Sequence, residues 1–363
     1  ERAQEFLDGF GARPPRRSAW VLFVRAFAGG HGRLRASLHM IAPLHPQRPR
    51  ALLMLLVANL FWGLSFPTIK AVLFLHDGFF GASATWFSTI YTIAPRFLVA
   101  TLILMLWIGR GFWRVTPGER KQGVVMGLFA AAGMFFQNDG LRYTDASTSA
   151  FLTQFYAILI PIWLGIRFRR NPGWRVWISS VLVLAGVAIL GRFDWAKLHL
   201  GRGEWETLLA SAFFMGQILW LEKPEFAANR PLHLTLVMFA TITVLFCLAA
   251  LVTAPDVAAL TMPWTSGPWV GLTLLLAVVC TVGAYYLMNT WQPKITAIEA
   301  GLVYCMEPIF GTVMAWYLPA VFSVWAGINY ANESPTWMLF VGGGLITVAN
   351  ILIQLRPPER RTA

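Results

Sequence analysis

Three ionisable side chains lie inside long apolar stretches of this sequence. Glu307 is followed directly by Pro308, Lys70 lies near the end of the first stretch, and Arg96 lies midway along the second. If these stretches cross a bilayer, a charged group within them is costly and needs a cavity, a substrate or a partner of opposite charge. Glu307 is therefore the sharpest candidate. It either binds a solute or a proton, or it forms a fixed ion pair with Lys70 or Arg96.

The two cations allow a second interpretation each. Lys70 shares a helical face with Asn59 and Trp62, but its long side chain could instead extend to the lipid headgroups. Arg96 cannot lose its proton, so it needs an acid, carbonyl groups or water around it. A purely structural pairing would also satisfy it. Lys70 and Arg96 are thus candidates for ion pairing as well as for coupling.

Uncharged polar and aromatic residues within the same stretches complete the candidate site. Tyr304 and Glu307 share a helical face, as do Thr153 and Tyr156, whereas Gln154 should point about 100° away from Thr153. Each could equally form a hydrogen bond between helices. Together they predict a largely apolar, aromatic cavity suited to amphipathic or aromatic solutes. The full candidate set is Asn59, Trp62, Gln137, Asn138, Thr153, Tyr156, Gln217, Tyr285, Asn289, Tyr304 and Glu307.

Composition shows which class of protein must position these residues. Of the 363 residues, 57% are hydrophobic and 13% are charged, about half the charged fraction of a soluble domain, with a mean hydropathy of +0.58. The sequence therefore predicts an all-α integral membrane protein. Cys247, Cys280 and Cys305 form no CxxC pair, and the six histidines lie outside the centres of the apolar stretches. Neither a metal site nor a cofactor is implied.

A membrane-spanning helix needs about 20 apolar residues, and the chain supplies ten such stretches. Tryptophans gather at their ends, where indole rings favour the headgroup level; Trp205, Trp220, Trp269 and Trp337 are examples. The ten predicted spans are 51–74, 84–109, 122–139, 145–166, 175–191, 205–222, 232–253, 268–290, 297–318 and 335–355.

Positive charge sets the orientation of these spans. With a cytoplasmic N-terminus, 23 of the 29 Lys and Arg residues lie in inside segments, four lie in outside loops and two lie within spans. Both termini are therefore predicted to be cytoplasmic, in a bacterial inner membrane. The net charge of +12 follows mostly from this topology, and no nucleic-acid partner is needed to explain it.

The two ends of the chain lie outside the predicted spans. Residues 1–50 are rich in Arg, Pro and Gly and poor in acids, and the printed chain begins at Glu1. We expect Met40 to lie near the true start, so that the preceding basic residues are an upstream reading-frame extension or a disordered tail; an organelle transit peptide is the alternative. Residues 356–363 are a predicted cytoplasmic tail.

The spans divide into two halves of five, residues 51–191 and 205–355. The third span of each half begins with a pair of glycines four residues apart, Gly123 with Gly127 and Gly267 with Gly271. Five is odd, so the second half must enter the membrane from the opposite side. This predicts an inverted repeat, which many secondary transporters use to alternate access to a central site. Close helix packing alone would also explain the glycines.

Several short motifs, in this order and spacing, carry a family resemblance. They are Phe61-Trp62-Gly63-Leu64-Ser65-Phe66-Pro67, Gly140-Leu141-Arg142-Tyr143-Thr144, Thr148-Ser149-Ala150-Phe151-Leu152-Thr153, Pro161, Trp291-Gln292-Pro293-Lys294 and Glu307-Pro308. From about Ala51 to Leu355 the chain resembles the EamA-type family of the drug/metabolite transporter superfamily. The resemblance implies ten helices around a central cavity, and export or exchange of small metabolites, amino acids or drugs.

Two departures from the family pattern concern the fourth and ninth spans. The family commonly ends these spans with Leu-Gly-Glu, but here the fourth ends in residues 166–170 and the ninth is followed by an insertion at 318–332. The insertion should lie on the outer face and could cap the cavity.

A secondary transporter working by alternating access is thus the predicted function, with a proton as one candidate coupling ion. A passive channel or a non-transporting receptor would share the polar residues without needing the repeat. A membrane-embedded enzyme would need paired acids, a Ser/His arrangement or a metal cluster at bilayer depth, and the only clearly intramembrane acid besides Glu307 is Glu299, near a helix start. The partners expected are a small-molecule substrate and the lipid bilayer, and a homodimer is one possible assembly.

Overall fold

The computed structural model describes residues 47–81, 84–168, 173–190, 200–295, 300 and 303–354. Every regular element among them is helical, which confirms the predicted all-α class. The predicted disordered segment, with its alternative start at Met40, and the predicted tail at 356–363 lie outside the described residues, except for residues 47–50.

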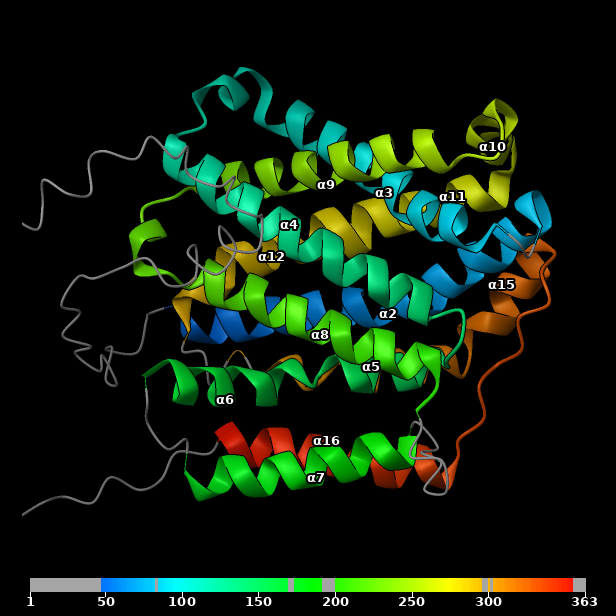
Figure 1. The fold of residues 1–363 in the computed structure, drawn as a ribbon. Coiled ribbons are helices and arrows are strands. Elements are labelled where there is room, and N and C mark those ends of the chain that lie inside the picture. The colour runs from blue at the N-terminus through cyan, green and yellow to red at the C-terminus, as the bar shows by residue number, and fades with distance from the viewer. Residues whose placement is uncertain are drawn as a thin grey trace, which may run out of the picture. The chain divides into compact units, whose positions relative to one another are not determined.

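The helices follow the predicted spans in order (Figure 1). The first half contains α2 (Arg48–Phe80), α3 (Thr85–Ile108), α4 (Pro117–Gly140), α5 (Ala146–Thr153), α6 (Tyr156–Phe168) and α7 (Trp174–Leu190). The second contains α8 (Arg202–Leu221), α9 (Pro231–Thr253), α10 (Val257–Thr261), α11 (Gly267–Leu275), a π-helical segment (Leu276–Gly283), α12 (Ala284–Trp291), α14 (Glu307–Ala315), α15 (Leu318–Ala326) and α16 (Trp337–Gln354).

Not all of these helices are equally suited to cross a bilayer. By length and apolar composition, five described helical segments could do so, and a sixth is added if α14 and α15, which meet at 51°, are counted as one bent span. α7 and α16 are apolar but shorter. Large apolar side chains such as Leu106, Val252 and Val324 are strongly exposed, as expected of helices that face lipid. That all ten predicted spans cross the membrane stays a prediction.

Contacts between the halves follow the pattern that a two-fold repeat predicts. Each contact between non-equivalent helices should then occur twice with the halves exchanged. α2 packs on α14 as α8 packs on α5 and α6, and α4 packs on α8 as α12 packs on α2. Equivalent helices also pair, α3 with α9 and α7 with α16, the latter pair lying side by side in Figure 1. The contacts thus support the proposed five-plus-five division.

The two glycine pairs that suggested the repeat are not equivalent in packing. Gly123 and Gly127 lie where α4 crosses α9, and an added Cβ there would come within 2.6 Å of Val237 and 2.8 Å of Thr241. Gly267 faces open space, and Gly271 faces the Trp325 ring. Only the first pair permits a close crossing of two long helices, so the glycine match is weaker support for the repeat than the helix contacts.

Two of the tryptophans predicted as interfacial anchors are buried instead. Trp220 is 3% exposed and Trp269 is fully buried, whereas Trp205 and Trp337 are exposed. The indole Nε1 of Trp269 donates a hydrogen bond of 2.8 Å to Nε2 of the buried His76. A buried indole needs such an acceptor, and this one ties α11 to the end of α2.

The two ends of the helix bundle differ in charge. One, here called the basic end, carries Arg114, Arg120, Lys121, Lys223, Arg230 and Lys294; the other, the acidic end, carries Asp77, Asp139, Asp145, Glu204 and Glu333. At the acidic end, Arg142 pairs with Asp77 at 2.8 Å and Arg202 pairs with Asp139. These contacts tie α2, α4 and α8 together where they meet.

Glu119 organises the basic end. Its carboxylate accepts hydrogen bonds from the Arg230 side chain at 2.6 and 2.9 Å, and it forms a capping box with Thr116 at the start of α4. Burial by itself would raise the pKa of Glu119, but the hydrogen bonds from Arg230 and from two backbone amides outweigh it and lower the pKa to about 2. The pair joins the first turn of α4 to that of α9.

This low pKa predicts acid sensitivity. A carboxyl group with a depressed pKa in the folded state stabilises the fold above its unfolded pKa of about 4.3, and this contribution is lost as pH falls toward the folded value. We expect the thermal midpoint of the detergent-solubilised protein to fall between about pH 4.3 and pH 2, and to fall less steeply in Glu119→Gln. Equal slopes in both proteins would contradict the assignment. Glu225→Gln, at an exposed ion pair with Lys121, is the control.

Candidate functional site

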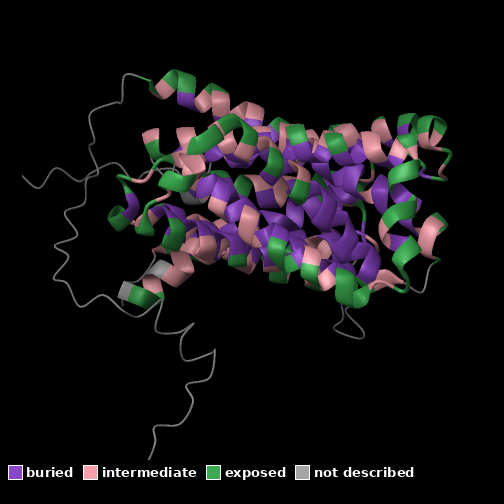
Figure 2. Ribbon diagram, turned by 90° about the horizontal axis from the view of Figure 1, so that it is seen from above, coloured by how far each residue is buried: buried purple, intermediate pink, exposed green. Residues whose placement is uncertain are grey.

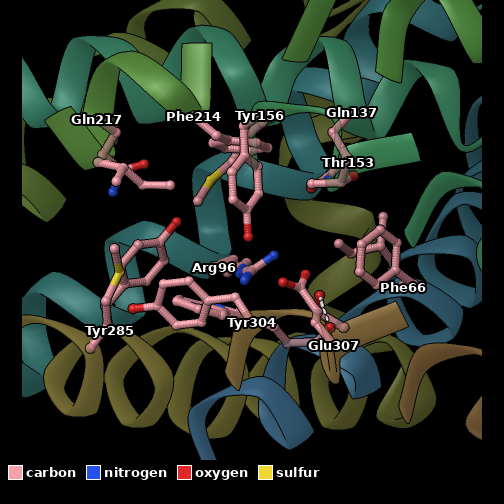
Figure 3. A pocket seen from close by; sticks show the side chains of 16 residues that line it. Phe66, Arg96, Gln137, Thr153, Tyr156, Phe214, Gln217, Tyr285, Tyr304 and Glu307 are labelled. Carbon is pink, nitrogen blue, oxygen red and sulfur yellow. Dashed lines mark hydrogen bonds between the residues drawn. The ribbon is translucent and has the colours of Figure 1, made fainter. Parts of the chain in front are cut away.

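A central pocket lies between helices of both halves (Figure 3). Its volume is about 80 Å³, room for only a few water molecules. Its walls come from α2, α3, α4, α5, α6, α8, α12 and α14 and from Tyr304, which precedes the turn before α14. The lining residues are Trp62, Ser65, Phe66, Ile69, Arg96, Met134, Gln137, Thr153, Tyr156, Phe214, Gln217, Ile218, Tyr285, Met288, Tyr304 and Glu307.

Two interrupted helices meet at this pocket. The helix of the fourth predicted span breaks at Gln154 and Phe155, between α5 and α6, and the ninth breaks at Cys305 and Met306, directly before α14. Across these breaks, Nε2 of Gln154 donates a hydrogen bond of 3.3 Å to Oε2 of Glu307. Irregular backbone at membrane depth is tolerated where it is buried in protein or lines a cavity. The two breaks lie in corresponding spans of the two halves, so the Gln154–Glu307 hydrogen bond joins one half to the other.

Glu307 lies in the first turn of α14, with Pro308 following it. Its side chain is 7% exposed, and the described residues include no ion pair to its carboxylate. A carboxylate in the first turn is favoured by the helix dipole, which compensates in part for its burial. Gln154 is thus the polar partner of one carboxylate oxygen of Glu307, and the Glu307 side chain lines the pocket.

Arg96 lines the same pocket and is held by a different helix. Its Nε donates a hydrogen bond of 2.5 Å to Oγ1 of Thr281, and Nη2 lies 3.4 Å from the carbonyl oxygen of Cys280. Both acceptors lie in the π-helical segment, where Thr281 Oγ1 donates in turn to the Leu276 carbonyl. π-Helical turns often mark functional sites because they expose backbone acceptors. Within the described residues, a hydroxyl and a carbonyl rather than an acid therefore hold this guanidinium.

Phenol rings and amides fill the space around these two charges. Figure 3 shows Tyr156 extending toward Arg96 and Glu307 from the opposite wall. Trp62 packs edge-on against Tyr285 and Tyr304, with centroid distances of 5.6 and 6.0 Å. The result is an aromatic chamber with one carboxylate, one guanidinium and several neutral hydrogen-bonding groups.

Most of the residues singled out from the sequence are brought together here. Trp62, Gln137, Thr153, Tyr156, Gln217, Tyr285, Tyr304, Glu307 and Arg96 all line the central pocket. Nε2 of Gln137 donates to Oγ1 of Thr153 at 2.9 Å, joining α4 to α5. Sequence reasoning placed Gln154 away from the site because it assumed a continuous helix. The break after Thr153 turns Gln154 toward Glu307 instead.

Four candidates lie elsewhere. Asn59 and Asn138 are buried and do not line the central pocket; Nδ2 of Asn59 donates to the Leu55 carbonyl of its own helix at 2.7 Å. Asn289 points toward α9 and donates to Oγ1 of Thr235 at 2.7 Å. These side chains are buried on other faces of their helices, because a helix has several buried faces and only one of them meets the pocket.

Lys70, the fourth, lies at the acidic end. Its Nζ donates to the Thr144 carbonyl at 2.7 Å and lies 3.9 Å from Asp145. It therefore neither pairs with Glu307 nor extends to lipid headgroups. A buried cation is costly without a partner. Here the Thr144 carbonyl and the Asp145 carboxylate, just before α5, are the partners of Lys70.

The insertion at 318–332 does not cap the central pocket, since none of its residues lines it. It forms α15 and a loop at the acidic end, leading to Glu333. The Glu333 carboxylate accepts hydrogen bonds from the backbone amides of Ala146 at 2.7 Å and Ser147 at 3.2 Å, capping α5. Burial raises the pKa of Glu333, although these hydrogen bonds oppose the shift.

Sequence reasoning also missed several lining residues. Ser65, Phe66, Ile69, Met134, Phe214, Ile218 and Met288 line the pocket without any sequence signal that separates them from ordinary core residues. Within the described part of the chain, no group of three or more His, Cys, Asp or Glu residues could hold a metal ion.

Comparison with known proteins finds a family match in the first half of the chain. The model of the EamA-like transporter family matches residues 49–192. This chain therefore carries an EamA domain. EamA belongs to the drug/metabolite transporter superfamily, so the resemblance found in the motifs is confirmed.

Two relatives extend the similarity beyond that domain. Two Archaeoglobus fulgidus proteins, each named an uncharacterized transporter, are 24% identical to it over 303 and 273 residues. The alignments cover 83% and 71% of this chain and 85% and 84% of the relatives. A crystal structure of a protein matches with a TM-score of 0.53 and 18% identity over 84% of this chain and 96% of that one, which shows the fold alone.

The EamA domain and these relatives make the chain an integral, multi-pass membrane transporter with a small-molecule substrate, and point away from an enzyme.

Proposed function

We propose that this protein is a secondary transporter that moves small amphipathic solutes, such as amino acids or related metabolites, by alternating access. The contact between Gln154 and Glu307 carries the proposal, because it joins the two interrupted helices inside a pocket built by both halves. Broken helices at a repeat interface typically form the transport site of such carriers.

The pocket chemistry favours solutes with both an apolar body and charged ends. Glu307 suits an ammonium group and Arg96 suits a carboxylate, and no ion pair joins the two within the described structure. The aromatic walls of Trp62, Tyr285 and Tyr304 would hold the apolar part. A strongly anionic solute would gain from Arg96 but meet Glu307.

The small pocket also favours a carrier over a channel. A cavity of about 80 Å³ is well below the roughly 300 Å³ or more of ordinary ligand sites. A solute can therefore enter only when helices move apart on one side, which a repeat of two packed halves allows. We place the basic end at the cytoplasm, where positive charge favours it, and Glu307 as the group that exchanges a coupling proton.

Counterflow in proteoliposomes tests the proposal. Vesicles preloaded with unlabelled amino acids should take up an external labelled amino acid above its equilibrium level, because a carrier exchanges solutes one for one. Gln154→Ala should reduce this uptake severalfold, whereas Ser180→Ala, whose hydroxyl donates to the Val176 carbonyl of its own helix α7, should not. Equilibration without overshoot would indicate a channel, and a protein that binds without uptake would be a receptor.

A further inference from the structure

Three polar residues form a continuous hydrogen-bonded chain at one boundary of the central pocket. The Tyr304 hydroxyl donates to Oε1 of Gln292 at 2.6 Å, and Nε2 of Gln292 donates to Oε1 of Glu222 at 2.9 Å. Glu222 ends α8, Gln292 follows α12, and Tyr304 precedes the break before α14. The chain thus joins three segments of the second half.

The two ends of this series of hydrogen bonds face different cavities. Tyr304 lines the central pocket. Gln292 and Glu222 line a second pocket of about 530 Å³ at the basic end, here called the vestibule, together with Lys223, Asn229 and Lys294 among others. The central pocket and the vestibule share no lining residue. The Tyr304–Gln292 hydrogen bond therefore spans the wall between them.

This wall is thin compared with the opposite side of the pocket. At the basic end it consists of Gln292, which is 3% exposed, and of Tyr304, which packs with Trp62, Trp291 and neighbouring apolar residues. Toward the acidic end, all eight residues of α5 and the whole stretch 87–97 of α3 are buried. In Figure 2, buried residues run through the interior of the bundle and are most frequent right of its centre.

We infer that Glu222, Gln292 and Tyr304 form the gate between the central pocket and the vestibule. The inference rests on the proposed function, since a gate has meaning only if solute passes through the pocket. Opening the gate itself breaks two hydrogen bonds and the packing of one tyrosine ring. Opening the acidic end would separate several buried helix faces and the ion pairs of Asp77 and Asp139.

The vestibule is a second solute site in this scheme. Lys223 and Lys294 line the vestibule together with Glu222. A zwitterionic solute would therefore meet positive and negative groups in the vestibule, as it would later in the central pocket. The Asn289 Oδ1 and Thr290 Oγ1 atoms are buried without a protein partner in the described structure, and both residues line the vestibule. These acceptors are available to a solute or to water.

The gate also separates the pocket from solvent protons. A carboxamide has no hydroxyl proton to pass on, so Gln292 interrupts any proton relay between Glu222 and Tyr304. Protons would reach Glu307 from the basic end only when the gate opens, together with solute. This is what tight coupling of proton and solute requires.

Cysteine accessibility tests the gate directly. The reporter is Ser65→Cys in the central pocket, in a protein with Cys247, Cys280 and Cys305 replaced by Ala. A small, membrane-impermeant methanethiosulfonate reagent is applied to vesicles of either orientation. Tyr304→Phe keeps the ring but removes the hydroxyl bond, and should raise the labelling rate from the basic end roughly 2- to 10-fold, the range expected for one lost hydrogen bond. Gln292→Ala should raise it further.

The matched control is Tyr286→Phe, which removes a hydroxyl from a tyrosine of α12 that packs on Trp107 and lies outside both pockets. It should leave labelling unchanged. Equal rates in the parent, Tyr304→Phe and Gln292→Ala proteins would overturn the gate while leaving the transport site intact, as would an increase confined to the acidic end. A folded protein whose reporter reacts from neither end in any variant would overturn the transport path itself.

Discussion

Glu307→Gln should keep its fold and still exchange solute, with a lower apparent affinity because the amide lacks the charge that attracts an ammonium group, but it should lose accumulation driven by a pH gradient. Gln retains the size of Glu and can still hydrogen-bond Gln154, but it cannot take up a proton. With one proton per electroneutral cycle, one pH unit supplies about 1.4 kcal/mol, which corresponds to about tenfold accumulation in the parent protein. In the variant, the labelled amino acid inside the proteoliposomes should reach only about its outside concentration.

Two outcomes would contradict this role. If Glu307→Gln still accumulates solute tenfold with the same pH dependence, the carboxylate is not the coupling group. If it cannot be purified folded, the ion-pair alternative gains support, since removing one partner of a buried pair is strongly destabilising. The structure argues against that alternative, because Lys70 is bound at the acidic end and Arg96 is held by Thr281. Glu225→Gln, an exposed carboxylate outside the pocket, is the control for accumulation.

Gly63→Ala should destabilise the protein and reduce transport together. A Cβ on Gly63 would lie 2.8 Å from the Gly311 amide nitrogen and 2.8 Å from Cβ of Phe310, so α2 and α14 would have to move apart. Overpacking of this kind costs about 1–3 kcal/mol. Because α14 carries Glu307 one turn away from this crossing, the same displacement should disturb the central pocket. The thermal midpoint in detergent and the counterflow rate should both fall.

Gly78→Ala is the matched control, in the same helix. No described residue lies within 4 Å of a Cβ at that position, and replacing a helical glycine by alanine lowers the entropy cost of folding by up to about 1 kcal/mol. Its thermal midpoint should equal or exceed that of the parent. If Gly63→Ala is as stable as Gly78→Ala, the close crossing of α2 and α14 is not present in the folded protein.

The class of this protein and most of its candidate site follow from local properties of the chain. Apolar length predicts helices, because a backbone in lipid must satisfy its own hydrogen bonds, and the expected all-helical fold is confirmed. The cost of a polar group inside an apolar stretch pointed to Glu307, Arg96 and Gln137 among others, and these line one pocket. Such reasoning needs only the composition of each stretch, which the sequence contains in full.

Only the tertiary structure decided which polar face of each helix meets the pocket. Asn59 and Asn289 carry the same sequence signal as Gln137, yet they bond to Leu55 and Thr235 instead, because the rotation of a helix depends on its neighbours. Gln154 joins the site only because its helix breaks, and Lys70 leaves it because the start of α5 offers oxygen atoms nearby. These outcomes depend on contacts between residues far apart in the chain, and local spacing does not encode them.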